Sequence, residues 1–226
     1  MGQSMISRSF AAVLPLVLQA TGGFAAVVGT NVAALPLTEE RIATLPRAQQ
    51  TAWREYLGRS MRQMQADRAV LEAELKKAGL SAALKAPSGS AAKSIPLDKP
   101  AEWYGGEAAR RIADIVVSFQ TPAGGWSKNL NLADHMRKPG EHFAPDNSSP
   151  VPGAADFDTP SDPKWEYVGT LDNDATTTEI RFLAKVAAAN KNAETWRAAL
   201  IRGIEYILAA QYPNGGWPQI WPLQGG

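Results

Sequence analysis

Apolar residues recur at helical spacing along much of this chain. Between Arg47 and Ala78 they return every three or four positions with charged residues between them, and Gly79 follows as a stop signal. The apolar members of this series are Trp53, Leu57, Met61, Met64, Ala69, Leu71 and Leu75. The pattern predicts a continuous helix over 47–78, inside an N-terminal helical extension that covers residues 35–80.

Three further stretches carry the same period. One helix is predicted over about 101–119, and a second is predicted to begin after Asp172 or Asp174 and to end at Ala189. A third is predicted over 194–210. Because the alternation typical of strands is scarce throughout, the fold class is expected to be all-α, with paired helices that form part of an (α/α) barrel or toroid.

Two other stretches have no period. Residues 81–100 are rich in Ala, Ser, Pro and Lys, which indicates a linker between the extension and a domain at 101–226. Between 129 and 168, closely spaced Pro and Gly leave no room for a long helix or strand. Loops of this length in a compact domain often carry function.

A seven-residue pattern, Gln-x-x-x-Gly-Gly-Trp, occurs at 120–126 and again at 211–217. Each copy follows a predicted helix, and a Pro two residues after the Gln forbids further helix. The Gly pair permits a tight turn that brings the Trp back onto the structure. The two copies are 91 residues apart, which suits two helical hairpins of an α/α barrel with a long insertion between them.

The first 34 residues resemble an export signal. Arg8 supplies a basic start, residues 10–18 an apolar core, and Val32-Ala33-Ala34 a small-residue cleavage site. The alternatives are an N-terminal helix or a membrane anchor, but Pro15 and Thr21-Gly22-Gly23 interrupt the apolar run. We therefore expect a signal peptide over 1–34, a secreted or periplasmic protein, and no membrane span after its removal.

Composition excludes several classes of function. The 226-residue chain has 45% apolar residues, enough for a sizeable core. Its 23 basic and 22 acidic residues balance, so no nucleic-acid partner is expected. There is no Cys, and His135 and His142 are the only two His, so thiol nucleophiles and three-His metal sites are impossible. The search therefore turns to carboxylates, Arg and Lys.

Asp172, Asn173 and Asp174 form a cluster of oxygen side chains just before a predicted helix, with Glu179 nearby. One interpretation is helix capping, in which a side-chain oxygen accepts a hydrogen bond from a free backbone amide. The other is a site for a hard cation such as calcium, which takes several oxygen ligands at once. The spacing is not that of an EF-hand.

Three segments together resemble the family 10 pectate lyases. They are QTPAGGWSKN at 120–129, GTLDNDATTTEIRFLA at 169–184 and AAQYPNGGWPQIWP at 209–222. The resemblance implies an all-α fold around a groove, secretion, and calcium-dependent β-elimination of polygalacturonate. The N-terminal helix and Ala/Pro-rich linker also resemble an extension found in some members.

The resemblance also implies roles for single residues. Asp172 matches the calcium-binding aspartate of the family's DNxATTTE motif, and Asn173, Asp174 and Glu179 are further candidates for the Ca²⁺ shell. Asp174 stands where the family commonly has Gly. Lys128 and Arg181 could pair with carboxylates of polygalacturonate or oligogalacturonides. For Arg181 the alternative is a salt bridge on the helix surface, for example with Glu179.

The Trp residues of the repeat region have two interpretations. They could stack on sugar faces, or they could anchor turns in the core. We predict a packing role for Trp126 and Trp217, and we keep Trp221 as a substrate-binding candidate.

The family's second acidic stretch and its catalytic Arg are expected downstream of Gly226, so no residue here is assigned as the base. The sequence is therefore interpreted as an incomplete lyase, and we expect a monomer with little or no turnover as this fragment. One alternative is a secreted, non-catalytic module that binds acidic polysaccharide. Another is a terpene-cyclase-like α/α-barrel enzyme, since Gln-x-x-x-Gly-x-Trp also resembles a motif of those enzymes, but the chain lacks an Asp-rich D-x-D-D motif.

Overall fold

The computed structural model describes residues 35–145 and 169–223. The chain divides into residues 1–32 and 33–226, and every described residue belongs to the second unit. The expected signal peptide at 1–34 lies outside the described residues, as do residues 146–168 of the Pro-rich loop. No described helix is both long and apolar enough to cross a bilayer.

A short helix, α1 (Glu39–Ala43), precedes the long helix α2 (Arg47–Ala78), whose bounds are those predicted. Gly79 ends α2 in the left-handed conformation with φ of 67°, which glycine adopts without steric cost. The Tyr56 hydroxyl donates to the Ala210 carbonyl oxygen at 3.0 Å. The extension is therefore hydrogen-bonded to the helix that precedes the second repeat.

Residues 81–100 are packed, although the sequence indicated a linker. They contain one turn of helix, α3 (Ala91–Ser94), and they bury Ala86, Ala91 and Ile95 in the main core. Single bridges join Leu84 to Glu141 and Ser88 to Leu130. The sequence did not reveal this packing, because the apolar residues of 81–100 are separated by turns and do not recur at a regular spacing.

The helix predicted over 101–119 is two helices. A 3₁₀ turn, η1 (Ala101–Gly105), is followed by α4 (Glu107–Ser118), and Gly106 between them is extended with φ of −80° and ψ of 167°. Gly105 and Gly106 favour such a break, since glycine is the least helical residue after proline. The apolar face of α4 is buried as predicted, with Ala109, Ala113, Ile115 and Val116 in the core.

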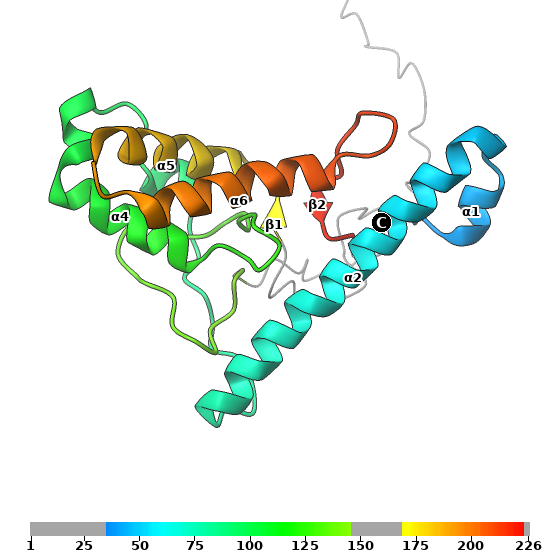
Figure 1. The fold of residues 1–226 in the computed structure, drawn as a ribbon. Coiled ribbons are helices and arrows are strands. Elements are labelled where there is room, and N and C mark those ends of the chain that lie inside the picture. The colour runs from blue at the N-terminus through cyan, green and yellow to red at the C-terminus, as the bar shows by residue number, and fades with distance from the viewer. Residues whose placement is uncertain (1–34, 146–168, 224–226) are drawn as a thin grey trace, which may run out of the picture. The chain divides into compact units, whose positions relative to one another are not determined.

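Helices α5 (Thr177–Ala189) and α6 (Glu194–Ala210) complete the helical part, and α6 has the bounds predicted. Figure 1 shows α5 and α6 side by side, with α4 along them. Only two short strands occur among the described residues, β1 (Gly169–Thr170) and β2 (Ile220–Trp221), paired antiparallel. The all-α class is confirmed for the described residues. Closure of the helices into a toroid stays a prediction.

The first copy of the repeat forms a compact turn after α4. The Gln120 side-chain amide donates to the Gly124 carbonyl oxygen at 2.8 Å, and the Trp126 indole N–H donates to the Val116 carbonyl oxygen at 2.7 Å. Gly124 has φ of 102°, a conformation that requires glycine. Trp126 is fully buried, as predicted.

The second copy makes the same bonds after α6. Gln211 donates to the Gly215 carbonyl oxygen at 3.0 Å, Trp217 donates to the Ile207 carbonyl oxygen at 2.9 Å, and Gly215 has φ of 89°. The packing role predicted for Trp217 is met only in part, because its N–H anchors the turn to α6 but the residue is 46% exposed. The two copies therefore share one internal geometry and differ in what covers them.

Candidate functional site

Asp172 lies where three parts of the chain meet. Its Oδ2 accepts hydrogen bonds from Lys128 Nζ at 2.7 Å and from Gln219 Nε2 at 2.9 Å. Its Oδ1 accepts from the Asn173 backbone N–H at 2.9 Å. The Asp172 side chain is 33% exposed and that of Lys128 is 13% exposed. Solvent therefore reaches the pair, although most of the Lys128 side chain is covered by protein.

Lys128 and Gln219 occupy equivalent positions of the two repeat copies. Each residue comes two positions after the Trp of its own copy. The shared turn geometry therefore delivers one polar side chain from each copy to the same carboxylate. Sequence reasoning missed Gln219, although the internal repeat that singled out Lys128 also marks its counterpart.

Thr170 fixes the turn that carries Asp172. Its N–H donates to the Trp126 carbonyl oxygen at 2.9 Å, and its hydroxyl donates to the Gln219 carbonyl oxygen at 2.7 Å. The same hydroxyl accepts from the Asp172 N–H at 3.1 Å. Because Thr170 is buried and bonded to both repeat copies, the position of the carboxylate depends on both.

Backbone strain gathers around this carboxylate. Within the described ranges, the non-glycine residues with positive φ are Asn129, Asn173, Asp174 and Thr176, at 61°, 53°, 59° and 64°. Such conformations cost of order 1 kcal/mol each and persist only where surrounding contacts hold them. A left-handed backbone at Asp174 also explains in physical terms why a glycine would suit this position.

The structure contradicts the capping interpretation of the acidic cluster. Helix α5 has Thr176 at its N-cap position, and none of Asp172, Asn173 and Asp174 caps it. The Thr176 hydroxyl instead accepts from the Trp126 N–H at 3.0 Å and donates to the Trp126 carbonyl oxygen at 3.2 Å. Because the turn at 173–176 has a left-handed backbone, the acidic cluster ends before the cap residue Thr176. Helical spacing in the sequence does not reveal such a turn.

Glu179 is fully buried in the first turn of α5. Burial raises the pKa of this carboxyl to about 8, although the backbone N–H groups of Thr176 and Glu179 oppose the shift. Neither carboxyl oxygen has a hydrogen-bond partner of good geometry among the described residues. The calcium role of Glu179 stays a prediction for this fully buried carboxyl.

Asp172 does fit a cation-binding role. The hydrogen bond from Lys128 holds the pKa of Asp172 below its usual range, so the carboxylate is ionised at neutral pH. Within the described part of the chain, no three Asp, Glu or His side chains gather as a metal-binding group. Asn173 and Asp174 are exposed neighbours of Asp172, and the set of Asp172, Asn173, Asp174 and Glu179 as calcium ligands stays a prediction.

Among the described residues, neither of the two remaining candidates, Arg181 and Trp221, is a hydrogen-bond partner of the Asp172 carboxylate. Arg181 is exposed on α5 beside a shallow pocket that Asp98 and Asp174 also line. No described ion pair joins Arg181 to Glu179. Trp221 is 3% exposed and meets the Tyr206 ring edge to face, with centroids 5.7 Å apart. Its ring face is covered, which contradicts the substrate-stacking role predicted for Trp221.

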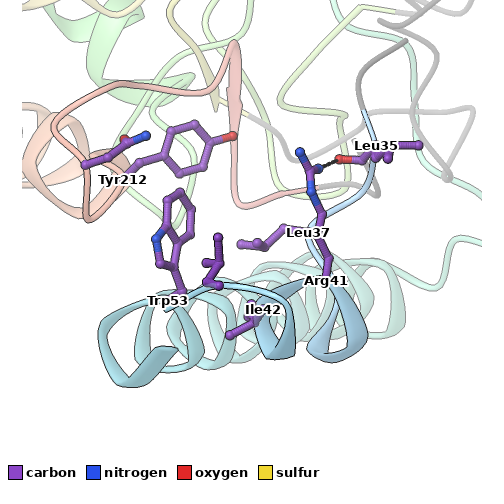
Figure 2. Close-up of a pocket in the computed structure, with 8 residues that line it drawn as sticks. Leu35, Leu37, Arg41, Ile42, Trp53 and Tyr212 are labelled. Atoms are coloured by element: carbon purple, nitrogen blue, oxygen red, sulfur yellow. Dashed lines mark hydrogen bonds between the residues drawn. The ribbon is translucent and has the colours of Figure 1, made fainter. Parts of the chain in front are cut away.

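A second hollow lies between α1, α2 and the second repeat turn. Figure 2 shows Trp53 and Tyr212 facing one another, with Leu37 and Ile42 nearby. The cavity measures about 360 Å³. The Arg41 guanidinium donates to the carbonyl oxygens of Leu35 and Pro36, which engages the one cationic group of the lining. This hollow is mainly apolar and lacks the ionised groups present around Asp172.

Comparison with known proteins finds one matching family model and similar solved structures. Residues 120–226 match a family model described as pectic acid lyase. Two solved structures of a family 10 polysaccharide lyase from Cellvibrio cellulosa are similar to the chain. One, a point mutant in complex with trigalacturonic acid, is 30% identical over 58% of this chain and 35% of its own length, with a TM-score of 0.37. The other is 29% identical over 59% and 34%, with a TM-score of 0.38.

The chain thus spans about a third of the length of the two Cellvibrio structures. No curated protein matches it. The family match includes both repeat copies and the turn that carries Asp172. The resemblance to pectate lyases predicted from these same segments is therefore confirmed for residues 120–226.

Proposed function

We propose, from the match of residues 120–226 to the pectic acid lyase family, that this chain forms the acidic-sugar-binding part of a polysaccharide lyase. The proposed substrate is polygalacturonate, and the proposed reaction is β-elimination. In that reaction the C5 proton is removed, the bond from C4 to the leaving oxygen breaks, and a double bond forms between C4 and C5. The leaving oxygen takes up a proton.

The observation that carries this proposal is the Lys128 and Asp172 pair. The Lys128 ammonium is held at 2.7 Å from Asp172, and both side chains have solvent-facing surface. An ammonium so positioned can turn toward a second carboxylate that arrives from solution. Gln219 then keeps a hydrogen bond on Asp172 while Lys128 shifts, which limits the cost of that exchange.

We further propose that the reaction depends on calcium and that Asp172 holds the ion, with Asn173 and Asp174 as the nearest additional oxygen side chains. Bound calcium would neutralise the uronate carboxylate and so make the neighbouring C5 proton more acidic. The ionised state of Asp172 supports this role. The catalytic base is not assigned to any described residue.

Export belongs to the same proposal. A polygalacturonate substrate is a polymer outside the cell, and the features of residues 1–34 are those of a signal peptide. We therefore propose a secreted or periplasmic protein. Arg181 remains a candidate for binding a further uronate carboxylate, since it is exposed and has a planar group suited to bidentate contact.

The proposal is tested by mapping a bound sugar on the chain. Trigalacturonate is titrated into isotope-labelled protein, and backbone amide shifts are followed with calcium and with a chelator. We expect shifts centred on residues 128–129 and 172–174 with calcium, and a neutral trigalactoside should cause none. Equal shifts from the neutral sugar, or shifts confined to the hollow in Figure 2, would refute the proposed site.

The same experiment separates lyase from binding module. If the chain binds trigalacturonate but releases no unsaturated uronide from polygalacturonate, the non-catalytic alternative is favoured for this chain. If unsaturated product forms with calcium and does not form with chelator, the chain has lyase activity.

A further inference from the structure

Tyr206 of α6 contacts the three segments that build the candidate site. These segments are the first repeat copy, β1 and β2. The side chain is buried, with the residue 1% exposed, and its hydroxyl donates to the Trp221 carbonyl oxygen in β2 at 2.9 Å. Burial raises the pKa of the Tyr206 hydroxyl well above its ordinary value, so the hydroxyl keeps its proton and remains a donor.

The ring of Tyr206 occupies the space beside two glycines. A Cβ on Gly125, in the first repeat copy, would stand 2.6 Å from Cζ of the ring. A Cβ on Gly169, in β1, would stand 2.9 Å from the same atom. Side-chain atoms do not approach so closely in a packed interior, so both positions exclude larger residues while Tyr206 keeps its place. The ring therefore fixes how closely the first copy and β1 approach α6.

The hydroxyl of Tyr206 acts on the segment that brings Gln219 to Asp172. Gln219 lies two residues before Trp221, whose carbonyl oxygen accepts from this hydroxyl. The Gln219 carbonyl oxygen accepts from the Thr170 hydroxyl at 2.7 Å, and its side-chain amide donates to Asp172 Oδ2 at 2.9 Å. A shift of β2 would therefore displace the Gln219 amide from the carboxylate.

Packing alone does not account for the hydroxyl of Tyr206. A phenylalanine ring would fill the same space between Gly125 and Gly169. A buried hydroxyl costs free energy unless it is hydrogen-bonded, and here its bond reaches β2 rather than its own helix. The bond thus ties α6 to the strand next to the candidate site.

We propose that Tyr206 is a positioning residue for the candidate site, and that its hydroxyl holds β2 so that Gln219 reaches Asp172. Lys128 approaches the same carboxylate from the other repeat copy. The relevance of this arrangement to sugar binding rests on the proposed function. The hydrogen bond from Gln219 to Asp172 belongs to the free protein, so it can be measured without calcium or sugar.

The variant that tests this role is Tyr206→Phe, which removes the hydroxyl and keeps the ring. In NMR spectra of the free protein, we expect the side-chain amide protons of Gln219 to change in chemical shift and to exchange faster with water. Their signals are assigned by their loss in Gln219→Met. Affinity for trigalacturonate in the presence of calcium should fall about three- to tenfold. In the Gln219→Met background, Tyr206→Phe should cause no further fall, because Tyr206 acts through Gln219.

A matched control is Tyr56→Phe. Tyr56 is 0% exposed, and its hydroxyl donates to the Ala210 carbonyl oxygen at 3.0 Å, at the end of α6. The two variants lose the same kind of buried hydrogen bond and should lose similar stability in urea unfolding. Tyr56→Phe should leave the Gln219 amide signals and the affinity for trigalacturonate unchanged.

Unchanged Gln219 amide signals in Tyr206→Phe would overturn the proposal. Equal changes in Tyr206→Phe and Tyr56→Phe would also overturn it, because they would reflect a general loosening of the core. Failure of the proposed function gives a different result. In that case the Gln219 signals change only in Tyr206→Phe, which supports the positioning role, while the unchanged protein does not bind trigalacturonate.

Discussion

The Lys128 ammonium lies 2.7 Å from the Asp172 carboxylate although 44 residues separate the two along the chain. Thr170 makes this approach possible, since it bonds the turn before Asp172 to the Trp126 carbonyl oxygen and to the Gln219 carbonyl oxygen. The pair therefore depends on the whole arrangement of the two repeat copies around one acidic turn.

Replacement of Lys128 should change the titration of Asp172. In Lys128→Met the hydrogen bond that lowers the pKa of Asp172 is lost, so the pKa should move upward toward its usual value. Carbon-detected NMR of the Asp172 carboxyl across acidic pH measures this shift. The unchanged protein gains stability from Asp172 above the unfolded-state pKa and loses it as pH falls through the lower folded-state pKa. An identical titration in both proteins would contradict the pairing.

Glu179 predicts a pH effect of the opposite sign. Its pKa is about 8 in the folded chain, against an ordinary value of 4.5, so the folded state keeps a proton that the unfolded chain releases. Stability from this group is complete below about pH 4.5 and is lost as pH rises through 8. Chemical denaturation measures the free energy of unfolding at pH 5 and at pH 8. Between these two pH values, Glu179→Gln should lose less of this free energy than the unchanged protein.

A matched control for that comparison is Glu72→Gln on the exposed face of α2. It removes the same chemical group without touching a buried site, so its pH dependence should follow that of the unchanged protein. If Glu72→Gln and Glu179→Gln behave alike, the buried carboxyl is not the source of the effect.

Two glycines inside helices should respond to alanine in opposite directions. At Gly203 in α6 a Cβ would stand 2.8 Å from Ile180 Cγ1 and 2.9 Å from Trp126, so Gly203→Ala should destabilise by about 1–3 kcal/mol. At Gly58 in α2 the nearest atom is the flexible end of Arg62, at 3.3 Å. Gly58→Ala should stabilise by about 0.5–1 kcal/mol through helix propensity. Urea midpoints measure both, and equal signs would refute the packing of α6.

The two repeat tryptophans should differ in their contribution to folding. Trp126→Ala removes a fully buried ring and its bond to Val116, which should cost about 3–5 kcal/mol. Trp217→Ala should cost less than about 1 kcal/mol, because the ring is half exposed. Thermal and urea unfolding measure the two losses. Similar losses would mean that the second copy is covered in solution.

The sequence predicted the helix bounds that depend on residues close together in the chain. The bounds of α2 and α6 follow from apolar period and from Gly79, whose left-handed conformation ends α2. The burial of Trp126 and Trp217 could not be told apart, since both copies have the same local pattern. Only the helix that covers one of them makes the difference, and that contact is distant in sequence.

At the candidate site the sequence identified Asp172 and Lys128 but not their partner Gln219. It grouped Glu179 with the candidate calcium ligands but did not show that this carboxyl is fully buried, because residue type and proximity in the sequence say nothing about burial. Asn173, Asp174 and Thr176 have positive φ values, and no side chain of the acidic cluster caps α5. Such backbone states arise from tertiary contacts, and side-chain patterns do not encode them.

The most direct test is calorimetric titration of trigalacturonate into the unchanged chain and into Asp172→Ala, each with calcium and with chelator. We expect binding only for the unchanged chain with calcium, and none for the variant in either condition. Thermal unfolding of the variant serves as the folding control, since Asp172 is partly exposed. Calcium-dependent binding of equal strength in Asp172→Ala would contradict the proposed site and remove Asp172 from it.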